Sequence, residues 1–333
     1  MLLKNTWRFI KKNYANDSRR TFHRTDLWRR RARAGFHRSV LWRWSCGGNR
    51  KIKMEGKNKK IEYPVCWCGE NDYEPILTGG KNGFEILGCR SCGLARTWPV
   101  PDASVERYAD YPIVAYRQNK KILMGFMRQL LRLVLKYKQG GQLLEIGSGA
   151  GYFLKIAQKH FAVKGLELSR AGAALSAKNL GPNVVQRKTL LRAASPDGFF
   201  TVVVLNHVLE HVADLGGLLA EINRVLEPGG LLVLGAPNFG GWFARWRKIK
   251  WPGLRPKEHV WQFTPQSLRQ ILKANGFVLR ATKQKASHNQ ASIFSRSNFS
   301  PRQFVLRIVN WLFGLLGRGD NLLVVAQRVE YGR

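Results

Sequence analysis

Acidic residues are scarce in this sequence of 333 residues, which has 21 Asp and Glu against 56 Lys and Arg and a formal net charge of +35. No run of about 18 apolar residues occurs, so no transmembrane helix is indicated, although peripheral contact with a membrane remains open. Nothing resembles a cleavable signal peptide, so disulfides are disfavoured and we expect a cytoplasmic protein. The 44% of hydrophobic residues is ordinary for a globular protein and excludes wholesale disorder.

Much of the positive charge lies in residues 1–60, which hold 19 Lys and Arg but only 3 Asp and Glu. This segment has neither helical nor strand periodicity, so we expect a basic, disordered leader. It could be sequence upstream of a natural start at Met54, a tail that binds polyanions, or a targeting peptide. The remaining net charge of +19 over residues 61–333 favours an anionic acceptor or surface.

Four of the five cysteines form two close pairs, Cys66 with Cys68 and Cys89 with Cys92, and a glycine follows each pair. Four thiolates from two tight turns suit a tetrahedral Zn²⁺ ion, although the first pair has the spacing CxC rather than CxxC. Such a zinc would be structural, because four cysteines leave no open coordination position. We therefore expect a zinc-ribbon-like module in residues 61–100; the alternative is two hairpins with buried thiols.

The second half of the chain alternates short apolar runs with helical stretches, which is typical of an α/β domain with a mainly parallel sheet. Its first run, LLEIGSGAGYFL at 143–154, ends in the glycine-rich turn Gly147–Gly151. A glycine turn after a buried strand lets a ligand contact the backbone at the carboxyl end of the sheet. A dinucleotide fingerprint needs a glycine where Tyr152 stands, and no Lys-Ser or Lys-Thr follows for a Walker-type site.

An acidic residue, Glu167, ends the next predicted strand, twenty residues after Gly147. A carboxylate at the tip of the second strand can accept hydrogen bonds from both hydroxyls of an adenosyl ribose. The alternative is a solvated carboxylate at the start of a helix. Together with the glycine turn, Glu167 favours a ligand-binding role.

These motifs resemble the class I S-adenosylmethionine-dependent methyltransferases over about residues 120–330. The resemblance rests on LLEIGSGAGYFL, VKGLELS and FFTVVVLNHVLEHV in this order. The cysteine pairs, EHVWQFTPQSLRQILKANGF and GRGDNLLVVAQR narrow it to a branch that resembles methyltransferase types 11 and 23. The resemblance implies that residues 101–333 form a Rossmann-like, doubly wound sheet with an antiparallel last strand, which binds S-adenosyl-L-methionine.

The resemblance also assigns roles to single residues. Its cofactor-binding residues are Glu145, Gly147, Gly149, Gly151, Glu167, Leu168, Asn206 and His207. Among them, Glu145 supports the turn, Glu167 binds the ribose hydroxyls and Leu168 packs on adenine. The family's usual adenine-binding acid has no counterpart in NVVQRKTLLRAA, so the backbone or Gln186 is expected to take its place.

A hydroxyl or carbon nucleophile needs one base beside the methyl donor. His207, Glu210 and His211 have the spacing i, i+3 and i+4, which predicts one face of a helical turn at the cofactor end of the sheet. A further histidine, His259, lies in the later segment EHVWQFTP. Three interpretations stay open: His211 or His259 is the base, the four residues hold a divalent metal, or Glu210 and His211 only support the loop.

Two predicted insertions, 238–263 and 286–320, lie outside the methyltransferase core and should select the acceptor. The first mixes Trp with Arg and Lys, which favours a flat or anionic acceptor: a small molecule, a sugar or a glycan. The alternative is a nucleic-acid methyltransferase or RNA-binding protein that uses the basic surface and the cysteine module. LNHVLEH stands where many base-amino methyltransferases have an NPPY-type tetrapeptide, which favours the small-molecule class.

Overall fold

The computed structural model describes residues 63, 65–79, 83–111, 113, 119–285, 308–309 and 312–329. The chain divides into two compact units, Met1–Tyr73 and Glu74–Arg333. The predicted leader, 1–60, lies outside the described residues, and so does most of the predicted insertion at 286–320.

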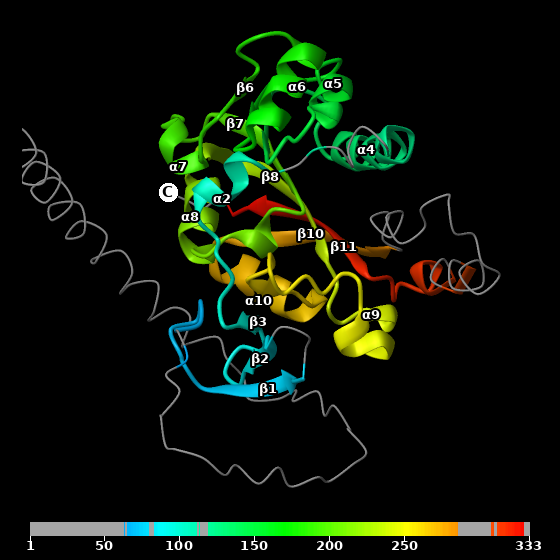
Figure 1. Ribbon diagram of the computed structural model, residues 1–333. Coiled ribbons are helices and arrows are strands. Elements are labelled where there is room, and N and C mark those ends of the chain that lie inside the picture. The colour runs from blue at the N-terminus through cyan, green and yellow to red at the C-terminus, as the bar shows by residue number, and fades with distance from the viewer. Residues whose placement is uncertain are drawn as a thin grey trace, which may run out of the picture. The chain divides into compact units, whose positions relative to one another are not determined.

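Within the described residues of the second unit, a seven-stranded sheet has the order β10-β11-β8-β7-β4-β5-β6 (Figure 1). Its strands are β4 (Gln142–Ile146), β5 (Ala162–Leu166), β6 (Val185–Gln186), β7 (Phe200–Asn206), β8 (Leu226–Pro237), β10 (Phe277–Lys285) and β11 (Asn321–Arg328). Strands β4 to β8 pair in parallel, whereas β11 is antiparallel to both β8 and β10. The predicted Rossmann-like sheet with an antiparallel last strand is confirmed.

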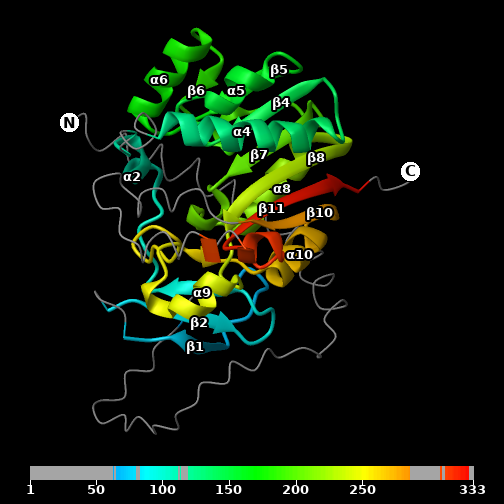
Figure 2. The same cartoon turned by 90° about the vertical axis from the view of Figure 1, so that its right-hand side faces the viewer.

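Helices lie on both sides of this sheet, as expected from its central strands β4, β7 and β8, whose residues are nearly all buried. They are α4 (Lys120–Leu135), α5 (Tyr152–Ala157), α6 (Arg170–Leu180), α7 (Leu190–Ala193), α8 (Leu215–Val225) and α10 (Pro265–Ala274). Figure 1 shows α4 and α8 on opposite sides of the sheet, and Figure 2 shows α4 running across the side that faces the viewer. The chain is thus doubly wound around the sheet.

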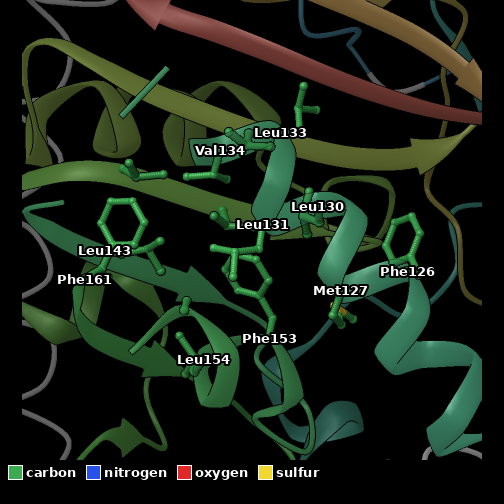
Figure 3. Close-up of a cluster of buried hydrophobic side chains, with 14 of the residues drawn as sticks. Phe126, Met127, Leu130, Leu131, Leu133, Val134, Leu143, Phe153, Leu154 and Phe161 are labelled. Atoms are coloured by element: carbon green, nitrogen blue, oxygen red, sulfur yellow. The ribbon is translucent and has the colours of Figure 1, made fainter. Parts of the chain in front are cut away.

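The main hydrophobic core lies between α4, α5 and the sheet (Figure 3). Phe126, Leu130 and Val134 recur every four residues along α4, so they share the helix face that points to the sheet. They pack in one buried cluster with Leu143 of β4 and Phe153 of α5, and Val134, Leu143 and Phe153 are fully buried. This packing fixes α4 against one face of the sheet, with Leu123, Phe126 and Met127 of its N-terminal half in the lining of the cleft described below.

A second sheet has the order β1-β2-β3-β9. Its strands are β1 (Tyr73–Leu77), β2 (Glu85–Cys89), β3 (Ala95–Trp98) and β9 (Trp261–Gln262). The first three fall in the predicted cysteine module, but β9 comes from the segment between β8 and α10 and pairs antiparallel with β3. The hydroxyl of Thr97 also donates a hydrogen bond to the carbonyl of His259 over 2.7 Å. Strand pairing and this hydrogen bond therefore connect β3 to the segment that carries His259.

Candidate active site

The glycine turn follows β4 and contacts the end of β5. Gly147, Gly149 and Gly151 have φ angles of 73°, 54° and 71°, a left-handed conformation that glycine adopts without steric penalty. A Cβ atom on Gly147 would lie 2.4 Å from Cγ2 of Val208, so this position also lacks room for a side chain. The N–H of Gly147 donates to the carbonyl of Leu166 over 2.8 Å, which holds the turn against β5.

Glu167 follows β5 and closes the turn from the other side. Its Oε2 accepts a hydrogen bond from the N–H of Gly149 at 2.6 Å, and its Oε1 accepts one from the N–H of Ser169 at 2.7 Å. Burial raises the pKa of this carboxyl, while the backbone hydrogen bonds act against the rise. A carboxylate oxygen can accept more than one hydrogen bond, so Glu167 retains the capacity to bind two ligand hydroxyls.

A cleft of about 800 Å³ opens over this turn, at the carboxyl ends of the parallel strands. Its lining includes nine of the residues that the sequence predicted: Glu145, Gly147, Glu167, Leu168, Asn206, His207, Glu210, His211 and His259. Gly149 and Gly151 lie in the turn behind this lining, and Gln186 is not among the lining residues. The structure thus brings the predicted cofactor residues and the predicted catalytic residues to one cleft.

Several buried oxygens at the cofactor end of the cleft have no hydrogen-bond partner among the described residues. Glu145 is 3% exposed and its Oε2 is unpartnered, as are Oδ1 of Asn206 and Oγ of Ser148. Burial, and then the charge of Glu167, raises the pKa of Glu145 well above its usual range. A ligand with positive charge and N–H donors would relieve both deficits. S-adenosylmethionine, a sulfonium that carries amino groups, fits these residues.

His207 follows β7 directly and has an unusual backbone conformation. Its φ of 56° lies in the left-handed region, and η1 (Leu209–His211), a 3₁₀ turn, begins only after it. The helical turn therefore starts later than the spacing predicted, although Nδ1 of His207 still lies 3.0 Å from Oε1 of the buried Glu210. Burial alone would raise the pKa of Glu210, but the hydrogen bond and charge of His207, with the other histidines, lower it to about 2. Glu210 is thus a buried carboxylate held by His207.

The rings of His211 and His259 meet edge to face, with ring centroids 4.7 Å apart. Burial lowers the pKa of His211, and it lowers the pKa of His259 to about 3. Nδ1 of His211 lies 3.1 Å from the carbonyl oxygen of Glu258. A carbonyl only accepts, so Nδ1 carries the proton and Nε2 of the neutral ring is left as an acceptor. His211 therefore has the tautomer that a general base requires.

The metal hypothesis names four residues, of which three come together. Glu210, His211 and His259 each offer a ligand atom within 4.8 Å of the others, a spacing that can hold a metal ion. His207 is outside this group, and its Nδ1 contacts Glu210 instead. A histidine base with a neighbouring carboxylate would bring these side chains equally close together, so the metal site stays a prediction.

Sequence reasoning did not find the cleft residues that come from distant segments. Tyr108 and Tyr111 lie before α4 and Lys188 follows β6, whereas Trp251, which also lines the cleft, belongs to the predicted insertion 238–263. The hydroxyl of Tyr108 is buried without a partner among the described residues, and its ring lies 5.7 Å from that of His211. Burial raises the pKa of Tyr108 to about 12, so it stays protonated and can donate a hydrogen bond. No local motif marks these residues, because only the tertiary fold brings them together.

Each cysteine pair lies in a tight turn: Cys66 and Cys68 in the first compact unit, and Cys89 and Cys92 in the second. In the first turn the N–H of Gly69 donates to the carbonyl of Cys66 at 2.9 Å, and in the second the N–H of Gly93 donates to that of Cys89 at 2.8 Å. Both glycines have positive φ, 90° and 69°. The N–H of the first cysteine in each turn donates to the residue after the glycine, at 2.7 and 2.9 Å. The two turns share one hydrogen-bond pattern, and the CxC turn is one residue shorter.

The comparisons with known proteins indicate a methyltransferase domain. A family model described as a methyltransferase domain matches residues 116–282, half of the chain. The ubiquinone biosynthesis O-methyltransferase of Paramagnetospirillum magneticum is 31% identical over 143 residues, which cover 36% of this chain and 56% of that protein. The enzyme of the same name from Bradyrhizobium is 32% identical over 103 residues, 30% of this chain and 41% of that protein. The chain thus spans about half the length of these relatives.

A structural comparison supports the fold. A chain in the complex of the Haloferax volcanii Trm112 methyltransferase activator with a methyltransferase is 14% identical, with a TM-score of 0.52, and the match covers 69% of this chain and all of that one. The chain belongs to the class I S-adenosylmethionine-dependent methyltransferases. Among its described residues, no helix is long and apolar enough to span a bilayer.

Proposed function

We propose that the chain transfers the methyl group of S-adenosylmethionine to a hydroxyl oxygen of a small organic acceptor, with His211 as the general base. The observation that carries the proposal is the hydrogen bond from Nδ1 of His211 to the carbonyl of Glu258, which leaves Nε2 to accept a proton in the cleft. The names of the curated relatives, O-methyltransferases of ubiquinone biosynthesis, support a small acceptor and an oxygen nucleophile.

The cofactor would lie along the glycine turn, with Glu167 on the ribose hydroxyls and Glu145 and Asn206 near its amino groups. When bound there, it supplies a methyl group already activated by the sulfonium. The remaining tasks for the protein are to align the acceptor oxygen, exclude water and remove one proton.

The proton would pass from the acceptor hydroxyl to Nε2 of His211. The imidazolium formed in this way is stabilised by the nearby carboxylate of Glu210, whose charge already opposes the fall in the pKa of His211. Tyr108 can also donate a hydrogen bond to the acceptor, because its hydroxyl is protonated and has no partner among the described residues. Lys188 and Arg255 in the lining suit an acceptor with negative charge.

Transfer of tritium from methyl-labelled S-adenosylmethionine tests the acceptor class. The panel would contain hydroxylated aromatic acids and hydroquinones, their methoxy analogues, a nucleotide sugar and an RNA oligonucleotide. We expect label in a small hydroxylated acceptor and none in its methoxy analogue. Label only in RNA would overturn the proposal in favour of nucleic-acid methylation, and label only in the sugar would move the acceptor to the glycan class. If EDTA abolished the activity and Mg²⁺ restored it, the result would favour a bound metal over His211 as the group that activates the acceptor.

A structural zinc on Cys66, Cys68, Cys89 and Cys92 completes the proposed function. The matching turns support it, because in each one a glycine of positive φ directs the backbone back toward the cysteine. Metal analysis of the purified protein should find about one zinc per chain. Changing Cys89 and Cys92 to Ser should remove it, and zinc retained by this double variant would contradict the assignment.

A further inference from the structure

Exposed leucines occupy the short helical turn before β11. Leu312, Leu315 and Leu316 are 45%, 66% and 70% exposed, and the N–H of Leu316 donates to the carbonyl of Leu312 at 3.0 Å. The spacing i, i+3, i+4 puts the three side chains on one face of the turn. Single exposed leucines are common on protein surfaces, but a contiguous group usually marks a contact site. We call these three residues the leucine face.

Aromatic stacking fixes this turn to the neighbouring helix α9 (Trp242–Arg247). The ring of Trp242 lies parallel to that of Phe313, with centroids 4.0 Å apart, and also stacks on Trp246 at 5.4 Å. Trp246 itself is 51% exposed. The turn is therefore held against α9 by Phe313, while its leucine side chains remain exposed. Tryptophan beside an exposed apolar face is typical of segments that lie at a membrane interface.

A basic hollow of about 320 Å³ lies between α4 and β10. Its charged lining residues are Arg132, Lys136, Lys283 and Lys285, and no carboxylate is among the described residues that line it. Nζ of Lys285 donates to Oε1 of Gln129 at 3.1 Å, which fixes this lysine at the edge of the hollow. The hollow thus concentrates positive charge without neutralising partners in its lining and suits phosphate groups.

The leucine face and the basic hollow lie on the same side of the second unit. Lys285, the last residue of β10, pairs with Asn321, the first residue of β11, four residues after the turn ends at Gly317. Figure 2 shows this side: α4 crosses it, and the short red helix before β11 and the yellow α9 lie below. More positive charge follows α9, where Lys248 and Lys250 form part of η2 (Lys248–Lys250).

We propose that this side of the chain docks on the surface of an anionic lipid bilayer, with the leucine face among the lipid headgroups and the basic hollow against their phosphates. Apolar side chains flanked by cations match a surface that is negatively charged outside and apolar beneath. RNA offers no partner for exposed leucines. A second copy facing the first through this side would bring two cationic hollows together, which opposes such a dimer.

Docking would place the acceptor end of the cleft near the lipid. Trp251 follows η2 directly and lines the cleft, as do Asp320 and Asn321 after the leucine turn. This consequence rests on the proposed function: the acceptor class would include molecules dissolved in the bilayer. The docking itself does not depend on methyl transfer, so the two can fail separately.

Sedimentation of the full chain with extruded vesicles tests the docking at physiological salt. We expect binding to phosphatidylcholine vesicles that contain phosphatidylglycerol and weaker binding to phosphatidylcholine alone. The double variant Leu315→Ser, Leu316→Ser should bind the anionic vesicles at least about tenfold more weakly. The variant Lys283→Gln, Arg132→Gln should lose most of the preference for anionic lipid. All variants keep residues 1–60, so any contribution of that basic segment is constant.

Two matched controls separate docking from general effects. Val278→Ser removes another exposed apolar side chain, 48% exposed on β10, and Lys155→Gln with Lys178→Gln removes two cations from α5 and α6. Both should bind vesicles like the wild type, and unchanged titration of S-adenosylhomocysteine would show that the leucine variant is folded. Unchanged vesicle binding of the leucine variant would overturn the proposal. A wild-type dimer that this variant converts to a monomer would assign the face to a second copy instead.

Discussion

The two ends of the cleft are built in different ways. Most of the cofactor end comes from one continuous stretch, β4 to Glu167, in which Gly149 and Glu167 are 18 residues apart and joined by a hydrogen bond; Asn206 and His207 are added from the end of β7. The acceptor end is assembled from distant segments: His211 is bonded to the carbonyl of Glu258, 47 residues away, and its ring packs on Tyr108. A local motif can therefore define cofactor chemistry, whereas acceptor choice depends on how the segments fold together.

The hydrogen bonding of the two ends differs as well. At the cofactor end, backbone N–H groups already orient Glu167, and the buried atoms without a partner among the described residues are oxygens: Oε2 of Glu145, Oγ of Ser148 and Oδ1 of Asn206. At the acceptor end, the Tyr108 hydroxyl, Nδ1 of His259 and Nε1 of Trp251 are buried with no partner among the described residues. Buried polar groups normally find partners, so these three are suited to a polar acceptor.

The largest effect is expected when the proposed base at the acceptor end, His211, is replaced. His211→Gln can keep the hydrogen bond to the Glu258 carbonyl but supplies no base, so kcat should fall about 10²- to 10⁴-fold. Titration calorimetry should give an unchanged Kd for S-adenosylhomocysteine. His160→Gln, an exposed histidine after α5, is the control and should change neither quantity. Loss of cofactor affinity in His211→Gln would show that the two ends are not separable.

The next largest effect is expected from a substitution in the glycine turn at the cofactor end. Gly147→Ala places a Cβ at positive φ and 2.4 Å from Val208, so the affinity for S-adenosylhomocysteine should fall roughly 100-fold. Gly181→Ala is a matched control, because its φ is 95° but nothing lies within 4 Å of the added Cβ. It should lose stability through backbone strain while cofactor affinity stays unchanged. Equal loss of affinity in both variants would attribute the effect to stability and not to the turn.

The pH dependence of kcat sharpens the assignment of the base. Burial lowers the pKa of His211 from its ordinary value of 6.5, and only the neutral ring accepts a proton. The rate should therefore rise about tenfold per pH unit at low pH and level off below pH 6.5. Stopped assays from pH 4.5 to 8 would measure it. A rate that still rises steeply above pH 7 would contradict His211 as the base.

The smallest effect is expected from removing the hydrogen bond that connects Thr97 of β3 to the carbonyl of His259. Thr97→Val removes the donor to the His259 carbonyl and should cost about 1–3 kcal/mol in the free energy of unfolding. Thermal unfolding should show a lower Tm. Thr282→Val, at an exposed position of β10, should leave the Tm nearly unchanged. Equal Tm values for the two variants would show that the Thr97 hydrogen bond contributes little.

The sequence pattern predicted a mainly parallel α/β sheet, the glycine turn and the approach of His207, Glu210 and His211 to one cleft, and the family resemblance added that the sheet is doubly wound. These depend on hydrophobic periodicity and short-range spacing, which are readable along the chain. It placed His207 inside a helical turn, because spacing does not reveal a left-handed residue at the end of a strand. It also missed Tyr108 and the pairing of β9 with β3, since a two-residue strand and a buried hydroxyl leave no periodic signal.

The most direct test of this account is calorimetric titration of S-adenosylhomocysteine into the wild type and Glu167→Ala. We predict one binding site per chain in the wild type, and no measurable binding once the carboxylate that bonds Gly149 and Ser169 is removed. Glu106→Ala, an exposed acid on α2 (Val105–Ala109), should bind like the wild type. A wild-type chain that binds no S-adenosylhomocysteine, or a Glu167→Ala variant with unchanged affinity, would contradict the site described above.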